Sequence, residues 1–509
     1  FSLPGQTDVI TPTFCGDRIG DVANDIAALQ QQYQAATLTA GPAVNGVFIG
    51  NILSASNSGT STNMFAPDYR TARSVQMNLG FQHEFGKGIV WTADFVRNVG
   101  TRNLLAVDVN HVGDASHLDT PAALDAITAT LEQNAPSCVP GVPMTAGSIS
   151  QAAIQCYLAT FNPANISDFA ANGLDSADSF CGGLPCWLNG QPDAAFPGKN
   201  KFLGTNQMLF PVGRSIYNAL QTSLKTHLGT PFRGAQGLDM QVSYSFSRYE
   251  ATAQDSDFIN SPEDANSPTH FRGPNGLDRT HQISFGGTLD LPRSFRVSFI
   301  SHFYSPLPLD LRLPTTGAAG GIFVSDITGD GTGDGTAVSN GNGFGDLLPG
   351  TKLGAYGRTV SPQGLSKIIT AYNQQLAGTP TPAGQALINA GILTKAQLSD
   401  LGGVLQPLNV PPPGQVELAW LKTFDLRASW QLKVRERFVV EPSAALFNVF
   451  NFGNFDGANN TLSGVLDGSY GSANGTSTRV GLNTRTGFGT GVFGLGAPRA
   501  LEFGLRITF

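Results

Sequence analysis

The chain has 509 residues, and 30 Lys and Arg against 37 Asp and Glu give it a formal net charge of −7. Charged residues make up 13%, about half the share found in ordinary soluble domains. No segment approaches the roughly 18 consecutive apolar residues that a transmembrane helix needs. The acidic balance, without runs of Lys or Arg, argues against nucleic acid and anionic lipid headgroups as partners. The 33 Phe exclude a disordered chain, so a large β protein rich in Gly and Phe remains.

The five cysteines all lie within the first 186 residues, in segments rich in turn-forming residues. Cys181 and Cys186 flank a Gly-Gly-Leu-Pro turn that suits a small disulfide, and Cys138 with Cys156 is the second predicted pair, which leaves Cys15 over. A zinc site is the alternative, but no Cys-x-x-Cys motif is present and no His stands near a Cys at ligand spacing. The pattern favours disulfides and an oxidising compartment.

Nine segments are predicted to form β-strands, because apolar and polar residues alternate along them with a period of two. Between 501 and 509, for example, Leu, Phe, Leu, Ile and Phe alternate with Glu, Gly, Arg and Thr. The segments are 72–85, 88–99, 212–228, 237–249, 279–291, 294–304, 416–433, 437–450 and 499–509. The alternating runs span roughly 10–17 residues, more than the roughly 5–6 of soluble strands and enough for the roughly 9–11 that cross a bilayer at a tilt.

The connections between these strands alternate in length. The short ones are residues 86–88, 229–236, 292–293 and 434–437, and the long ones are residues 100–211, 250–278, 305–415 and 451–498. Short periplasmic turns that alternate with long extracellular loops are typical of outer-membrane barrels. A soluble β-sandwich, the alternative fold, does not require short and long connections to alternate. We therefore predict an all-β fold, with a transmembrane antiparallel outer-membrane β-barrel in residues 72–509.

The alternation of short and long connections, together with the number of strands, also predicts how much of the barrel this chain contains. If the C-terminus is periplasmic, the chain enters the strand at 72–85 from outside, so residues 1–71 form an extracellular loop region. Nine strands is an odd number, whereas bacterial single-chain barrels have an even number. Counting residues 45–53 as a short first strand would give ten. The favoured interpretation is the C-terminal part of a larger barrel whose first strands lie upstream.

Motifs spread over residues 65–509 resemble those of known outer-membrane proteins. The chain ends on Phe509, with Phe503, Leu505 and Ile507 at every second position before it, which resembles the signal read by the barrel-assembly machinery of Gram-negative bacteria. Tyr-Arg-Thr-Ala at 69–72, Tyr-Asn-Ala-Leu-Gln at 217–221 and Phe-Asn-Val-Phe-Asn-Phe-Gly-Asn-Phe at 447–455, in this order, resemble TonB-dependent receptors of the Oar-like type, common in Acidobacteria.

The resemblance implies a signal peptide, an N-terminal carboxypeptidase-regulatory-like β-sandwich, a plug and a barrel of about 22 strands. It also implies uptake of a large solute, with outer-membrane lipid, the barrel-assembly machinery and the TonB complex as partners. The sequence departs from this pattern because no segment resembles the plug or the TonB-contacting box. Energised uptake is therefore implied by the resemblance alone and is assigned to no residue of this chain.

Asp326, Asp330 and Asp334 lie in a Gly-rich loop and are the candidate metal ligands. Carboxylate oxygens beside Gly turns suit calcium, which takes about six to eight oxygen ligands. Their spacing of four residues differs from that of an EF-hand loop. The alternative is a solvated turn in an extracellular loop. Calcium is the one candidate cofactor.

Inward-facing charges form a second candidate site. Across the short connection at 434–437, Glu441 is predicted to lie near Arg427 and Ser429, while Arg506 approaches from the closing strand. Opposite charges across strands fix their register, at about 0.2–1 kcal/mol each, and the same groups could line a solute path. The structural role is favoured, because a lumen is polar whatever it carries.

Four helices are predicted within the long connections, over 119–133, 148–160, 365–376 and 383–401. Such helices either cap a barrel and hold a ligand or fold a loop against its own apolar side chains. No Gly-x-Ser-x-Gly, His-Glu-x-x-His or phosphate-binding Gly motif is present, so an enzyme is not expected. The predicted function is uptake or binding of a large solute across the outer membrane. The alternatives are a surface adhesion or structural barrel and a passive porin.

Overall fold

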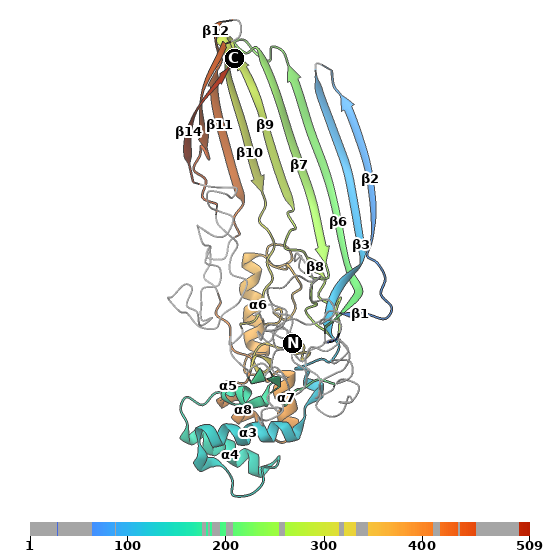
Figure 1. Ribbon diagram of the computed structural model, residues 1–509, viewed down its shortest axis with the longest axis vertical. Coiled ribbons are helices and arrows are strands. Elements are labelled where there is room, and N and C mark those ends of the chain that lie inside the picture. The colour runs from blue at the N-terminus through green and yellow to red at the C-terminus, as the bar shows by residue number, and fades with distance from the viewer. Residues whose placement is uncertain are drawn as a thin grey trace.

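A long curved β-sheet dominates the structure, with a body of loops and helices at one end of its strands (Figure 1). The computed structural model describes residues 28, 64–86, 88–175, 180–181, 184–185, 194–199, 207–253, 260–314, 320–331, 345–410, 418–435, 438–454 and 498–509. The additional strand considered at 45–53 lies outside the described residues.

Nine long strands form an antiparallel meander, in which each strand pairs with the long strands before and after it in the chain. In spatial order they are β2 (Arg73–Glu84), β3 (Ile89–Asp108), β6 (Gln207–Leu228), β7 (Gly237–Ala251), β9 (His281–Leu291), β10 (Phe295–Tyr304), β11 (Leu421–Trp430), β13 (Phe438–Phe447) and β14 (Ala500–Thr508). The short strands β1 (Met64–Phe65), β8 (Gly273–Pro274) and β12 (Leu432–Arg435) pair with β6, β7 and β13. Each predicted strand is confirmed, with shifted ends.

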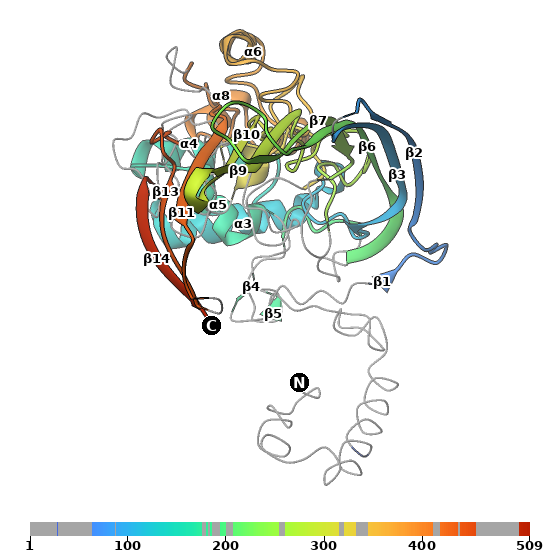
Figure 2. The ribbon, with the colours of Figure 1, turned by 90° about the horizontal axis from the view of Figure 1, so that it is seen from above.

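Viewed along the strands, the sheet curves into an arc with β2 at one end and β14 at the other (Figure 2). Among the described strands, β2 pairs only with β3 and β14 only with β13. The described sheet is therefore an open arc and not a closed ring. The short connections lie at the end of the strands where the chain finishes, and the helices lie at the opposite end (Figure 1).

The two faces of the sheet differ in chemistry, as the alternation predicts. The outer face is apolar, and Leu79 on it is 77% exposed. Aromatic pairs lie on this face at both ends of the strands. Phe295 stacks on Trp430 near the short turns with ring centroids 5.1 Å apart, and Phe424 lies 5.2 Å from Phe450 near the loops. An apolar band with aromatic residues at both edges is typical of a barrel wall that faces lipid.

Strand β3 continues nine residues beyond its predicted end at 99. A register shift after Thr101 interrupts its pairing with β6, and Arg102 takes a φ of 61° there. Beyond the shift, Leu105 and Ala106 are buried within the loops. The alternation stops because both faces of this extension are covered, which is why the sequence pattern ended too early. The predicted strand at 416–433 is divided, since Gln431 separates β11 from β12.

Two of the long connections carry helices. The connection from β3 to β6 contains α3 (Thr120–Asn134), α4 (Ser148–Thr160) and α5 (Ile166–Phe169), and that from β10 to β11 contains α6 (Pro362–Gln375), α7 (Pro382–Asn389) and α8 (Lys395–Asp400). Shorter helical turns are η1 (Ala115–His117), η2 (Pro136–Cys138), η3 (Ala170–Leu174), η5 (Pro292–Ser294) and η6 (Gly321–Phe323). In the part of the chain that the structure describes, no helix combines the length and apolarity needed to cross a membrane.

The single helix predicted over 383–401 is two helices. Gly391, with a φ of 74°, follows the end of α7 in the left-handed conformation that favours glycine. Thr394 then caps α8: its hydroxyl accepts from the Gln397 backbone N–H at 3.2 Å, and the Gln397 side chain accepts from the Thr394 N–H at 3.0 Å. This reciprocal capping box starts a new helix.

Both helical connections pack into one body, which we call the loop module (residues 109–175, 320–331 and 345–408). Ile127 and Tyr157 from the first connection share a buried core with Phe323 and Leu387 from the second. Hydrogen bonds cross between the two connections as well, because the Ser150 hydroxyl donates to the Ile392 carbonyl at 2.7 Å. The two loops therefore fold as one unit.

The predicted disulfide between Cys138 and Cys156 is present and joins positions 18 residues apart, in η2 and α4. Cys181 ends strand β4 (Phe180–Cys181), which pairs with β5 (Leu184–Pro185) in a tight hairpin. Its predicted partner Cys186 lies outside the described residues, as does Cys15. The predicted disulfide between Cys181 and Cys186 therefore lies outside the described residues.

Removing the disulfide through Cys138→Ser with Cys156→Ser is expected to destabilise the loop module by about 3 kcal/mol, because the unfolded chain regains the freedom of a loop of this length. The sheet should keep its stability, since its hydrogen-bond ladders lie elsewhere. Limited proteolysis followed by mass spectrometry measures both parts. Cleavage that is unchanged in the loop module would mean that helix packing alone holds it together.

Candidate solute-facing surface

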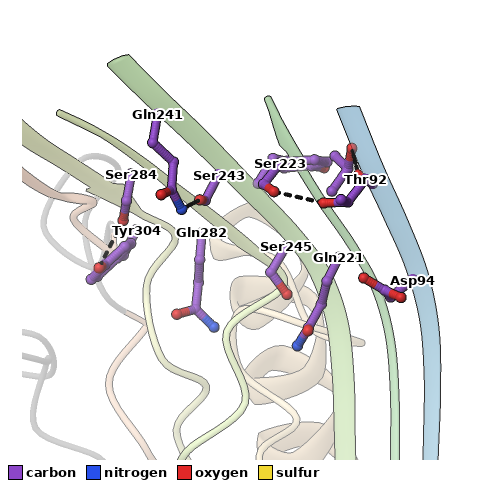
Figure 3. Close-up of a pocket in the computed structure, with 12 residues that line it drawn as sticks. Thr92, Asp94, Gln221, Ser223, Gln241, Ser243, Ser245, Gln282, Ser284 and Tyr304 are labelled. Carbon is purple, nitrogen blue, oxygen red and sulfur yellow. Dashed lines mark hydrogen bonds between the residues drawn. The ribbon is translucent and has the colours of Figure 1, made fainter. Parts of the chain in front are cut away.

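A hollow of about 340 Å³ lies on the inner face of the sheet. Residues of β3, β6, β7, β9 and β10 line it, most of them at alternate positions, and the labelled side chains point into the same space (Figure 3). The lining is rich in Ser and Gln, and Asp94 is the one charged residue among the described residues that form it. Because successive side chains of a strand point to opposite faces, residues between them such as Ala93 and Val242 belong to the apolar outer face.

Hydrogen bonds between strands hold the polar side chains of this hollow. The hydroxyls of Thr92 and Ser223 are 2.7 Å apart, and those of Ser284 and Tyr304 are 3.0 Å apart. Hydroxyl and amide groups can both donate and accept. The surface can therefore form hydrogen bonds with the hydroxyl or amide groups of a solute without removing a charge from water.

A second hollow of about 350 Å³ lies farther round the inner face, where β10, β11, β13 and β14 meet. It contains charged groups, because Asp425, Arg427 and Glu502 line it. The Arg427 guanidinium donates to the Ser443 hydroxyl at 3.1 Å. The described lining thus holds one charged residue in the first hollow and three in the second.

The structure brings together two of the three charged residues predicted to cluster in the lumen. Glu441 lies directly opposite Arg506 in the β13–β14 pair, whereas Arg427 lies opposite Ala445. Within the described residues, no ion pair joins Glu441 to either arginine. The ladder places Glu441 near Gln431, because Ser429 pairs with Ser443 and Leu432 pairs with Val440. Arg427 is four positions farther along β11, so the predicted proximity of Glu441 and Arg427 is wrong.

Sequence reasoning missed an ion pair on the inner face. Arg296 and Asp290 lie opposite each other in the β9–β10 hairpin and form two hydrogen bonds, of 2.7 and 3.2 Å. The sequence did contain a signal for this pair, because Asp290 and Arg296 each lie three positions from Arg293, which is in a tight turn. Equal distances from such a turn place residues opposite each other.

The apolar residues at the C-terminus lie where the alternation places them. Phe503, Leu505 and Ile507 of β14 are exposed on the outer face, and Phe509 follows them at the end of the chain. Recognition of these residues by the barrel-assembly machinery stays a prediction.

Two of the predicted calcium ligands, Asp326 and Asp330, are only 0% and 2% exposed within the loop module. The alternative of a solvated turn is therefore wrong for both of them, while Asp334 lies outside the described residues. Asp346, which sequence reasoning missed, adds a third buried carboxylate. The Thr328 hydroxyl oxygen is 3.1, 2.9 and 2.9 Å from carboxylate oxygens of Asp326, Asp330 and Asp346.

This arrangement disfavours negative charge. Thr328 has a single hydroxyl hydrogen and can donate to only one of the three carboxylates, and Asp346 Oδ1 has no hydrogen-bond partner in the described chain. Burial and the nearby Asp346 and Asp330 raise the pKa of Asp326 well above its usual range. Burial and Asp330 do the same to the pKa of Asp346. Within the described ranges, no group of three or more His, Cys, Asp or Glu side chains is arranged to hold a metal ion, so calcium stays a prediction.

Replacing Asp346 with Asn is expected to stabilise the loop module near pH 8 and to have little effect near pH 4. A carboxyl whose pKa is raised on folding favours the folded state most at low pH, and this contribution is lost as the pH rises from about 4 through the raised pKa. A gain of about 1 kcal/mol would raise the Tm by roughly 2–4 °C.

Thermal unfolding in EDTA, repeated with calcium, measures this effect. A variant that is less stable than the wild type in EDTA at both pH values would contradict the prediction. A loss of stability that appears only with calcium would support the calcium site instead.

Comparison with known proteins places this geometry in a family. Residues 18–489 match the family model described as outer membrane beta barrel domain. No curated protein matches the sequence significantly. Among solved structures, the chain is similar to the outer membrane transporter YddB from Escherichia coli, with 9% identity, a TM-score of 0.33, and coverage of 76% of this chain and 30% of that one. It is also similar to the copper transporter OprC, with 7% identity, a TM-score of 0.28, and coverage of 86% and 31%.

The chain spans about a third of the length of these two structures. The family model, in contrast, covers nearly the whole chain, and the apolar outer face with its aromatic edges agrees with it. The chain therefore belongs to the outer membrane beta barrel domain family and is located in the outer membrane.

Proposed function

We propose that this chain forms part of the wall of an outer-membrane transporter and that its inner face conducts a polar solute. The observation that carries the proposal is the hollow of about 340 Å³ on that face. Hydroxyl and amide groups from five strands converge in it (Figure 3). Such groups offer hydrogen bonds that exchange readily with those of a passing solute.

The resemblance of the barrel motifs to Oar-like TonB-dependent receptors extends this proposal. In that case, the barrel has about 22 strands, a plug closes it, and the TonB complex drives the uptake of a large solute. The loop module then makes the first contact with the solute from outside the cell. A passive porin is the alternative in which no energy is needed.

The loop module supports a second candidate, surface adhesion. It has its own buried core and a disulfide, so it can present a firm surface to another cell or to a matrix without any transport. Under this alternative, the inner face of the sheet is polar only because water fills the space that this face borders.

Transport is tested with Ser243→Trp in the hollow and with Val242→Trp as the matched control. Ser243 lines the hollow, whereas Val242 is its neighbour on the outer face, where an indole ring contacts lipid. We expect the first variant to lower uptake about tenfold, which corresponds to about 1.4 kcal/mol of lost binding. The second should leave uptake unchanged. The measurement is accumulation of fluorescently labelled oligosaccharides and peptides by cells that carry the full-length protein.

The same cells without a functional TonB complex separate energised from passive passage. Loss of uptake supports the TonB-dependent proposal, and retained uptake supports the porin. If cells with and without the protein accumulate every probe equally but differ in attachment to surfaces, transport is wrong and adhesion takes its place.

A further inference from the structure

Four arginines gather on the outer face of the sheet, near the ends of the strands that lead into the long loops. Arg97 of β3 and Arg248 of β7 lie in one row, with Asn218 of β6 between them. Arg73 of β2 and Arg214 of β6 lie in a second row, four residues closer to the loops. We call these four residues the arginine belt.

The belt lies on the face opposite the hollow. Asp94 of β3 lines the hollow (Figure 3), so Arg97, three residues along, belongs to the outer face. By the same alternation, Ser245 of β7 lines the hollow and Arg248 does not. The pairing of β2, β3 and β6 has no shift up to Thr101, so the second row keeps this orientation.

The arginine belt carries an excess of positive charge. Arg73 and Arg214 are exposed, and neither pairs with an acidic side chain of the described chain. Arg97 donates to the Asn218 side-chain oxygen at 2.8 Å. Arg248 pairs with Glu250 at 2.8 Å while its own side chain stays 63% exposed. Donor groups therefore remain available to an external anion.

The first row lies directly above a row of exposed apolar side chains. Those side chains are Leu79, Phe95, Leu220 and Phe246, which pair across β2, β3, β6 and β7. Arg248 lies ten positions along β7 from Leu238 near the short turn, and Arg97 lies eight positions along β3 from Ile89. At about 3.3 Å per residue and a tilt of about 40°, these stretches rise about 20–25 Å, close to the roughly 25 Å height of the apolar band of such barrels. The belt thus begins where the lipid headgroups begin.

We propose that the arginine belt binds the phosphate groups of lipid headgroups in the membrane leaflet next to the long loops. A guanidinium group presents paired N–H donors that match two phosphate oxygens. The acyl chains of the same lipid would lie on the apolar row below, so the lipid would contact one continuous surface. A lipid is favoured over a soluble anion for this reason, because a soluble anion would make no use of that row.

The test uses bisphosphorylated lipid A and the full-length protein in detergent, with native mass spectrometry to measure bound lipid. The double variants Arg73→Gln with Arg214→Gln and Arg97→Gln with Arg248→Gln should each weaken binding about 25-fold, at about fivefold for each arginine. Arg233→Gln, in the exposed turn between β6 and β7, removes one charge at the opposite end of the strands and should change nothing.

Heat-dependent migration on gels verifies that each variant is folded, and replacement of the arginines by Lys gives a second test. Lys keeps the charge but loses the paired donors, so binding should be intermediate. Weaker binding of dephosphorylated lipid A by the wild type supports the proposal. Equal binding of the phosphorylated and dephosphorylated lipids, or equal loss in Arg233→Gln and the belt variants, would overturn it.

Discussion

The rest of this structure depends on the pairing of backbone amides and carbonyls, since none of them finds a partner in lipid. A continuous antiparallel ladder satisfies them strand by strand, and the nine-strand meander supplies it across the described sheet. Once the ladder is set, the pleat sends alternate side chains to opposite faces. The apolar outer face and the polar hollow are therefore two consequences of one hydrogen-bond pattern.

The loop module follows a different rule, because water surrounds it and its stability comes from packing. Segments far apart in the chain share its core, and buried ion pairs join the loops in and beside it. Arg358 donates to Asp278 at 2.6 Å, and Arg312 forms two hydrogen bonds of 2.6 Å with Glu263. Removing one member of such a pair leaves an uncompensated buried charge, so these contacts make the positions of the loops depend on one another.

The placement of charge separates the three environments of the chain. Uncharged polar groups dominate the hollow of about 340 Å³, carboxylates are buried in the loop module, and arginines lie at the edge of the apolar band. The composition argued against anionic lipid as a partner because no basic run exists. Arg73, Arg97, Arg214 and Arg248 are far apart in sequence, and the strand register alone makes them neighbours.

Alternation with a period of two was enough to locate the strands, assign the faces and place Phe503 and Leu505 toward lipid, because a strand's pleat is a local property. Gly391, which ends one helix, and Thr394, which caps the next, were likewise present in the sequence, although residues 383–401 were predicted to form a single helix. Tertiary structure alone decided which strand residues stand opposite each other, that Asp346 joins Asp326, and that two distant loops share a core. Register shifts and long-range packing depend on contacts between segments that no local pattern contains.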